Sequence, residues 1–119
     1  MTLESFVTTS GNGYELVLYR IGGKDCNSSM PESAPKGPMI FVHGASSDAS
    51  TWFYRTDNDL DLIGTQYAME GYDVWYANLR GSIPSRSHEL TSFDPDGQFE
   101  FQRGAYWDFD YNDMAEQDI

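Results

Sequence analysis

The chain has 119 residues, enough for one domain or part of one, and 39% of them are hydrophobic and 15% aromatic, which is typical of a folded chain rather than a disordered one. Its 7 Lys and Arg oppose 19 Asp and Glu, and the resulting formal net charge of -12 repels phosphate backbones, so we expect no nucleic-acid partner. No apolar run approaches the roughly 18 residues that cross a membrane, and the first residues lack the basic and apolar regions of a signal peptide.

An antiparallel hairpin is predicted at the start. Residues 5–9 and Tyr14–Ile21 are strand-like and flank Ser10-Gly11-Asn12-Gly13, a turn-forming tetrapeptide. Residues 22–37 are rich in Gly, Pro, Ser and charge, and we interpret them as an exposed loop. The loop holds Cys26, interpreted as a surface thiol, and Asn27, which opens an N-x-S pattern and is a candidate glycosylation site.

A short buried strand, Pro38–Val42, is predicted next. It ends abruptly at His43-Gly44 and passes into a loop of small and hydroxylated residues. A buried strand that ends in a glycine and a small-residue loop leaves main-chain N–H groups free to point into a cleft. That arrangement is the one that an oxyanion hole requires.

The strand Pro38–Val42, a helix and a second, parallel strand are predicted to form one unit of about forty residues. Leu60, Ile63 and Tyr67 recur at helical spacing, Gly71 is a C-terminal stop, and residues 72–77 are strand-like. Such a βαβ unit predicts an α/β fold.

The last third of the chain is predicted to hold a long surface excursion and one more helix. Residues 82–103 are polar and turn-forming. Beyond them Asp110 is a suitable N-cap for a helix with Asp113 in its first turn, and we expect this helix to run to Ile119 without a terminator. An aromatic group in this region is interpreted as packing for that helix, with contact to lipid as the alternative; it comprises Phe99, Phe101, Tyr106, Trp107, Phe109 and Tyr111.

Six sequence blocks stand out along the chain: FVTT with NGYEL near the start, HG with a later STW, GYDVW, NLRG, SRSH, and WDFDYNDMA near the end. In this order they resemble the N-terminal portion of the gastric and lysosomal acid lipases, a family of α/β-hydrolases. The resemblance covers nearly the whole chain except residues 22–37. Asn12 stands where the family usually has Asp. The resemblance implies an incomplete α/β-hydrolase domain spanning residues 1–119.

The resemblance also implies one half of an oxyanion hole. In the family one N–H comes from the residue after His-Gly, which is Ala45 here, and the other comes from the residue after the nucleophilic serine. Family members usually carry a bulky apolar residue where this chain has Ala45, so the acyl pocket would be less filled.

The catalytic triad is predicted to be absent from this chain. A lipase of this type needs a serine in a G-x-S-x-G elbow, followed by an Asp and a His. No pair of glycines brackets a serine in that pattern here. We therefore expect no catalytic residue, no metal and no cofactor in these 119 residues.

Five residues are predicted to structure the loops around this edge of the sheet: His43, Gly44, Asn78, Arg80 and Gly81. A catalytic-base role for His43 is disfavoured because it has no serine elbow to serve. For Arg80 the alternative is binding of a carboxylate or lipid headgroup. His88 is interpreted as a loop-packing residue. The acids Asp57, Asp59 and Asp61 are interpreted as a helix-entry cluster rather than a Ca²⁺ loop.

The chain is thus interpreted as the N-terminal fragment of a lipase or carboxylic ester hydrolase that acts on a triacylglycerol or steryl ester in lipid catabolism. The fragment alone is predicted to be inactive. The alternative is a truncated, non-catalytic pseudoenzyme or interaction module. The resemblance implies a lysosomal or secreted protein, and a complete N-terminus without a signal peptide would imply an intracellular one.

Overall fold

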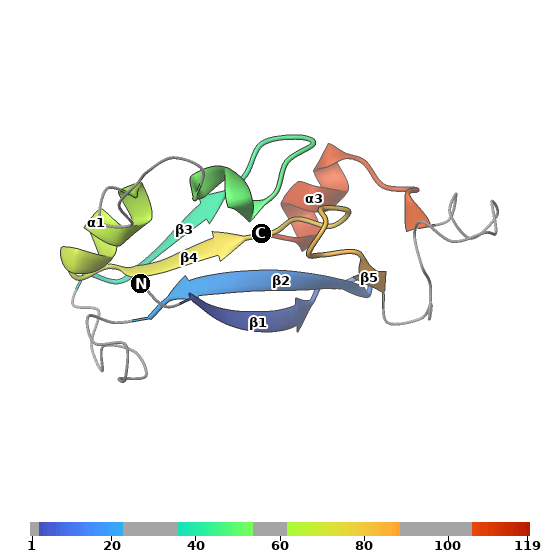
Figure 1. The fold of residues 1–119 in the computed structure, drawn as a ribbon. Coiled ribbons are helices and arrows are strands. Elements are labelled where there is room, and N and C mark those ends of the chain that lie inside the picture. Colours follow the sequence, from blue (N-terminus) through green and yellow to red (C-terminus); the bar gives the residue numbers. More distant parts are fainter. Residues whose placement is uncertain (1–2, 23–35, 54–61, 89–105) are drawn as a thin grey trace.

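The computed structural model describes residues 3–22, 36–53, 62–88 and 106–119. Its centre is one mixed β-sheet of five strands with the order β1-β2-β4-β3 and with β5 paired to β2 (Figure 1). The predicted mixture of helices with parallel and antiparallel strands is confirmed.

The opening hairpin forms as predicted. β1 (Leu3–Thr9) pairs antiparallel with β2 (Tyr14–Ile21), in a register that places Thr9 opposite Glu15. The turn is closed by a hydrogen bond from the Ser10 N–H to the Tyr14 carbonyl at 2.8 Å. Gly13 has a φ of +93°, in the left-handed region that glycine adopts without strain.

The parallel pair is also confirmed, but the expectation of a buried first strand is wrong: no residue of Pro38–Val42 is buried and Ile40 is 59% exposed, because this strand lies at the edge of the described sheet. β3 (Pro38–Val42) and β4 (Asp73–Ala77) lie side by side with Met39 opposite Val74. The connection between them contains the 3-10 helix η1 (Ala49–Trp52) and helix α1 (Ile63–Met69). Gly71, the predicted helix stop, has a φ of +96°.

Of the residues at helical spacing, Tyr67 packs against the core and Ile63 does not. Ile63 is 46% exposed, whereas Leu62, Gly64 and Thr65 are buried. A Cβ on Gly64 would overlap the hydroxyl of Tyr76 in β4, so the helix approaches the sheet at its glycine. The apolar periodicity could not indicate this, because a glycine carries no hydrophobic signal. Leu60 lies outside the described residues.

Part of the predicted surface excursion belongs to the sheet. β5 (Ser87–His88) pairs with the start of β2, with His88 opposite Tyr14. Residues 82–86 form the turn that leads from β4 to β5, and residues 89–103 of the predicted excursion lie outside the described residues.

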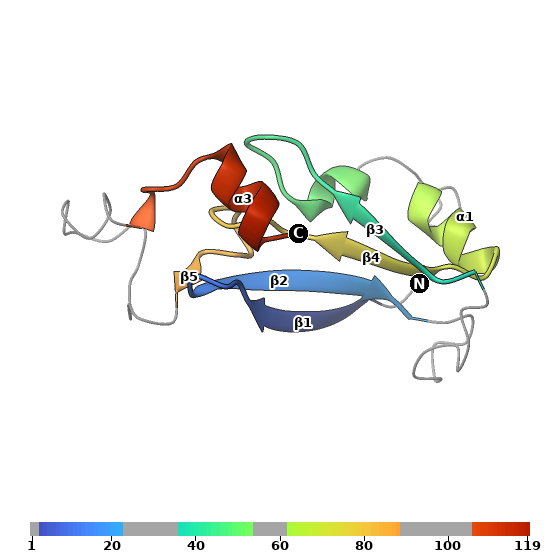
Figure 2. The same cartoon turned by 180° about the vertical axis from the view of Figure 1, so that it is seen from behind.

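The last helix, α3 (Tyr111–Gln117), begins as predicted. Asp110 is its N-cap and forms a capping box with Asp113. The expectation that the helix continues through Ile119 is wrong, because it ends at Gln117 with Asp118 as its C-cap. Figures 1 and 2 show α1 and α3 at opposite ends of the sheet, with α3 beyond the carboxyl ends of β3 and β4.

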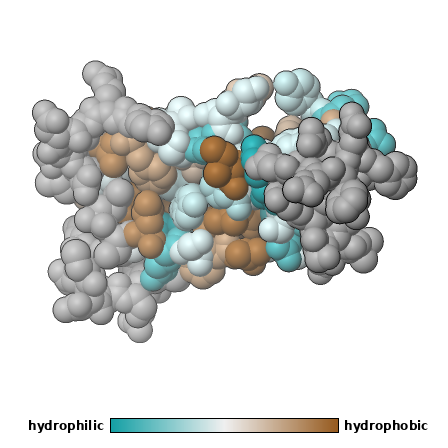
Figure 3. Space-filling view, turned by 45° about the vertical axis from the view of Figure 1, so that its right-hand side comes forward, coloured by the Kyte–Doolittle hydropathy of each residue, from teal (hydrophilic) through white to brown (hydrophobic). Residues whose placement is uncertain are grey.

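Two hydrophobic clusters hold these elements together. The larger lies between the sheet and the connection from β3 to β4 and is built on Ile21, Ala49, Val74 and Tyr76. The smaller joins β2 to the segment before α3 and consists of Tyr14, Leu16 and Tyr106, with Phe109 packed against it. Tyr111, predicted to pack in the core, is 73% exposed. In Figure 3 the hydrophobic residues of the coloured surface form patches that hydrophilic residues separate.

No helix in the described parts of the chain is both long and apolar enough to cross a membrane.

Candidate functional site

A pocket of about 950 Å³ lies at the carboxyl ends of β3 and β4, the edge at which α/β folds commonly bind ligands. Three segments line it: the loop of residues 43–48 after β3, the turn of residues 79–83 after β4, and the chain around the start of α3. Among the predicted site residues, the pocket brings together His43, Gly44, Ala45, Arg80 and Gly81. Asn78 lies beside it and is buried.

The loop after β3 exposes the main chain predicted to form half of an oxyanion hole. Gly44, Ala45 and Ser46 are exposed, and no group among the described residues accepts a hydrogen bond from the Ala45 N–H. Ser46 has a φ of +59°, a left-handed conformation that is uncommon for a residue with a side chain and is concentrated at functional sites. A Cβ added to Gly44 would meet no atom within 4 Å, so the missing side chain leaves the pocket open beside Ala45.

His43 connects the end of β3 to the end of β4. Its Nε2 accepts a hydrogen bond from the Leu79 N–H at 3.1 Å, so the ring proton lies on Nδ1, which donates to the Gly44 carbonyl at 2.8 Å. The side chain is buried, with 8% of the residue exposed. Both ring nitrogens are therefore occupied by backbone groups.

Asn78 ties η1 to the sheet. Its side-chain oxygen accepts a hydrogen bond from the Ala49 N–H at 2.9 Å, and its amide donates to the Val17 carbonyl at 2.9 Å. The residue is 1% exposed. Because η1 follows the loop directly, this side chain fixes the far end of residues 43–48.

Asp48 begins η1. Its carboxylate accepts a hydrogen bond from the Ser50 N–H at 2.8 Å. Hydrogen bonds from Ser50 to the carboxylate lower the pKa of Asp48.

Arg80 is fully buried and held by several groups. Its Nε and Nη2 donate to Oδ1 of Asp118 at 2.8 and 2.6 Å, and its Nη2 also donates to Oδ1 of Asn12 at 3.0 Å. The guanidinium carbon lies 4.2 Å from the centre of the Tyr14 ring. The Arg80 side chain is 0% exposed and its guanidinium binds the Asp118 carboxylate, a geometry that favours the predicted structural role over binding of an external carboxylate or lipid headgroup.

Gly81 allows an aromatic ring to cover the turn. Its φ is +78°, and a Cβ here would lie 2.5 Å from the Trp107 ring. Trp107 and Phe109 line the pocket, as do Tyr111 and Met114 of α3. Apart from Asp110, the residues that this part of the chain contributes to the pocket are aromatic or apolar.

Two residues with structural contacts at this site were not predicted. Ser85 is 1% exposed, and its hydroxyl accepts from the Val17 N–H at 2.8 Å and donates to the Asn78 carbonyl at 2.9 Å. Ser85 stands in the SRSH block, but nothing in that block showed what its hydroxyl binds. Asp118 falls after the last block and carried no signal.

His88 packs its ring edge against Tyr14, with ring centroids 4.7 Å apart, and its Nε2 lies 3.0 Å from the Asn12 carbonyl oxygen. Within the described ranges, no cluster of three His, Cys, Asp or Glu side chains could hold a metal ion. Cys26, Asn27 and the acids Asp57, Asp59 and Asp61 lie outside the described residues.

No protein-family model matches the chain. Curated relatives do match it. Human lysosomal acid lipase/cholesteryl ester hydrolase is 32% identical over 116 residues, and human lipase member K is 33% identical over 118 residues; each match covers 98% of this chain and 26% of the relative. Mouse lipase member M is 31% identical over 116 residues, which cover 98% of this chain and 25% of the relative.

The chain therefore spans about a quarter of the length of these relatives. The resemblance to the N-terminal portion of the acid lipases is confirmed by these matches.

Proposed function

We propose that this chain, a relative of the acid lipases, forms the oxyanion-hole side of a lipid-ester hydrolase and contains none of its catalytic triad. The observation that carries the proposal is the Ala45 N–H. It is exposed at the carboxyl end of the parallel strands, beside a pocket, and has no acceptor among the described residues.

The loop that presents this N–H is held from three sides. The His43 ring is bonded to Leu79, the Asn78 side chain is bonded to Ala49, and the Asp48 carboxylate caps η1. A donor fixed before the substrate arrives can stabilise a developing oxyanion without reorganising during the reaction. In this proposal His43, Gly44, Asn78, Arg80 and Gly81 shape the site and take no part in proton transfer.

The substrate class follows from the apolar residues of the pocket and from the relatives. Trp107, Tyr111 and Met114 offer an apolar surface in the pocket that Ala45 also lines, as an acyl chain requires. The relatives' names include lipase and cholesteryl ester hydrolase. The proposed substrate of a protein that contains the whole site is a triacylglycerol or a steryl ester. Ile83 and Tyr111, each 73% exposed at the pocket, are suited to contact a lipid interface.

We also propose that the protein is lysosomal or secreted, because a relative is named as a lysosomal acid lipase. The rival function, a non-catalytic pseudoenzyme or interaction module, draws support from the absence of a G-x-S-x-G elbow in the sequence.

The messenger RNA that encodes this chain separates the two functions. If the lipase proposal is right, the reading frame continues beyond the codon for Ile119 into a strand followed by a G-x-S-x-G elbow. A stop codon at that point, together with a stable 119-residue product in cells, would contradict it and favour the pseudoenzyme.

The Ala45 role has its own test if such a longer product exists. Replacing Ala45 with Pro removes the N–H, and we expect kcat for a p-nitrophenyl ester to fall by about 10²–10³. Ala45→Gly retains the N–H and is the control. An unchanged kcat in a folded A45P protein would remove Ala45 from the oxyanion hole.

A further inference from the structure

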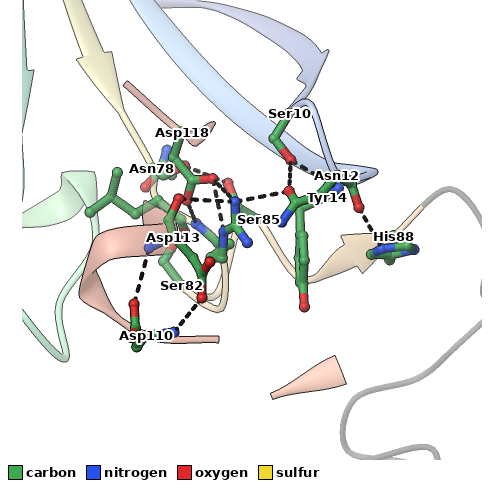
Figure 4. Close-up of polar contacts among 12 residues, drawn as sticks. Ser10, Asn12, Tyr14, Asn78, Ser82, Ser85, His88, Asp110, Asp113 and Asp118 are labelled. Atoms are coloured by element: carbon green, nitrogen blue, oxygen red, sulfur yellow. Dashed lines mark hydrogen bonds and ion pairs between the residues drawn. The ribbon is translucent and has the colours of Figure 1, made fainter. Parts of the chain in front are cut away.

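The carboxylate of Asp118, directly after α3, is buried against the turn that follows β4. The side chains of Asp118 and Arg80 are both 0% exposed. Asp118 accepts three hydrogen bonds from Arg80: from the backbone N–H at 2.9 Å, from Nε at 2.8 Å and from Nη2 at 2.6 Å. Figure 4 shows Asp118 and Asn12 approaching this point from different parts of the chain.

Among the described residues, helix α3 has few other attachments. None of residues Tyr111–Gln117 is buried, and the helix is only seven residues long. Short helices gain most of their stability from packing rather than from their own hydrogen bonds. The charged contact at its carboxyl end is therefore a principal attachment of α3 to the sheet.

The same contact fixes the direction of the Arg80 side chain. The guanidinium lies 4.2 Å from the Tyr14 ring centre and 5.5 Å from the Phe109 ring centre. Without Asp118, the remaining oxygens on the guanidinium are Asn12 Oδ1 at 3.0 Å and the Asp113 carbonyl at 3.5 Å. A buried cation that loses its anion is strongly unfavourable, so the turn and α3 would separate to admit water.

We propose that Asp118 is a positioning residue for the pocket. Through Arg80 it holds α3 and the neighbouring aromatic residues in the pocket that the Ala45 loop also lines. Met114 and Tyr111 of α3 and Trp107 before it are the parts of the pocket lining that depend on this attachment. The inference rests on the proposed function only for the nature of the bound chain.

The test compares three variants of the chain. Asp118→Asn keeps the size of the side chain and removes its charge. Glu116→Gln makes the same chemical change at an exposed position of α3. Val74→Ala weakens the other hydrophobic cluster, in which Val74 is 1% exposed, and leaves Arg80 and Asp118 intact.

Amide hydrogen exchange and the Trp107 indole resonance in NMR spectra are the primary readouts. For Asp118→Asn we expect the amides of Arg80 and α3 to exchange at least about tenfold faster than in the parent chain, and the Trp107 resonance to shift. Glu116→Gln should change neither. Val74→Ala should lower the melting temperature without a selective effect on α3. Parent-like exchange and an unmoved Trp107 resonance in Asp118→Asn, or the same selective change in Val74→Ala, would overturn the proposal.

Sodium laurate is the ligand probe. In an NMR titration we expect Asp118→Asn to bind laurate about tenfold more weakly than Val74→Ala does. Equal affinity in the two variants would contradict a role of Asp118 in shaping the pocket. If laurate fails to bind even the parent chain, the acyl-binding part of the proposed function fails, and the exchange rates alone then decide the positioning role.

Discussion

Replacing Asn78 with Ala removes the side chain that connects η1 to the sheet beside the candidate oxyanion loop. The Ala49 N–H donates to the Asn78 side-chain oxygen at 2.9 Å, and Ala49 is 0% exposed, so water cannot replace this acceptor. An unsatisfied buried N–H costs about 1–3 kcal/mol. The Val17 carbonyl loses the Asn78 amide but keeps the Asn78 backbone N–H at 3.1 Å, so its loss adds about 0.5–1.5 kcal/mol.

The expected destabilisation is therefore about 1.5–4.5 kcal/mol. Urea unfolding monitored by circular dichroism measures it, as a lower midpoint with an unchanged slope. Asn112→Ala, on the exposed first turn of α3, is the control and should change stability by less than about 0.5 kcal/mol. A loss below about 1 kcal/mol for Asn78→Ala would refute the idea that this side chain fixes the loop.

Three further predictions concern the sheet and its tyrosines. Gly64→Ala should destabilise the chain by about 1–3 kcal/mol in urea unfolding, because the new Cβ would lie 2.8 Å from the Tyr76 ring carbon that bears the hydroxyl. Tyr76→Phe should leave the stability measured by calorimetry unchanged or raise it, since the buried Tyr76 hydroxyl has no partner among the described residues. Tyr14→Phe removes a 2.6 Å hydrogen bond to the Tyr106 carbonyl and should lower the stability by about 0.5–1.5 kcal/mol. A larger loss of stability for Tyr76→Phe than for Tyr14→Phe would contradict these assignments. Burial raises the pKa of both Tyr76 and Tyr106 to about 12, above the ordinary value near 10, so the folded state retains these protons longer than the unfolded state. The stability from this source is complete below about pH 10 and is lost as the pH rises to about 12. Absorbance at 295 nm should show that at least the phenols of Tyr76 and Tyr106 ionise late, and ionisation of all phenols near pH 10 in the folded chain would contradict this prediction.

Sequence patterns predicted the opening hairpin and the parallel pair because these depend on local signals, whereas β5 and the pairing of β2 with β4 and β5 were not predicted. The hairpin was predicted from its turn residues, and the parallel pair was predicted from two apolar runs separated by a helical pattern. The pocket-lining position of Ala45 was also expected, through its place after His43-Gly44. These features can be predicted from residues that are neighbours in the chain or from the resemblance of the sequence blocks to the acid lipases.

Contacts between distant residues were not predictable in this way. Asp118 binds Arg80 across 38 positions, and the Ser85 hydroxyl binds the Val17 N–H across 68 positions. The close approach of α1 to the sheet at Gly64 was not predictable either, because a glycine adds nothing to an apolar pattern. Hydrophobic periodicity indicates which large side chains share a face of a helix. It does not indicate where a small residue allows the helix to approach the sheet closely.

The most direct test of the central claim is the reaction of the purified 119-residue chain with p-nitrophenyl butyrate and with a fluorophosphonate that labels activated serines. Because an oxyanion-hole donor without a nucleophile cannot turn over an ester, we expect p-nitrophenol release at the buffer rate and no phosphonate adduct by mass spectrometry. Enzymatic turnover together with one phosphonate on a serine of this chain would contradict the claim that these residues form only the oxyanion-hole side of the site.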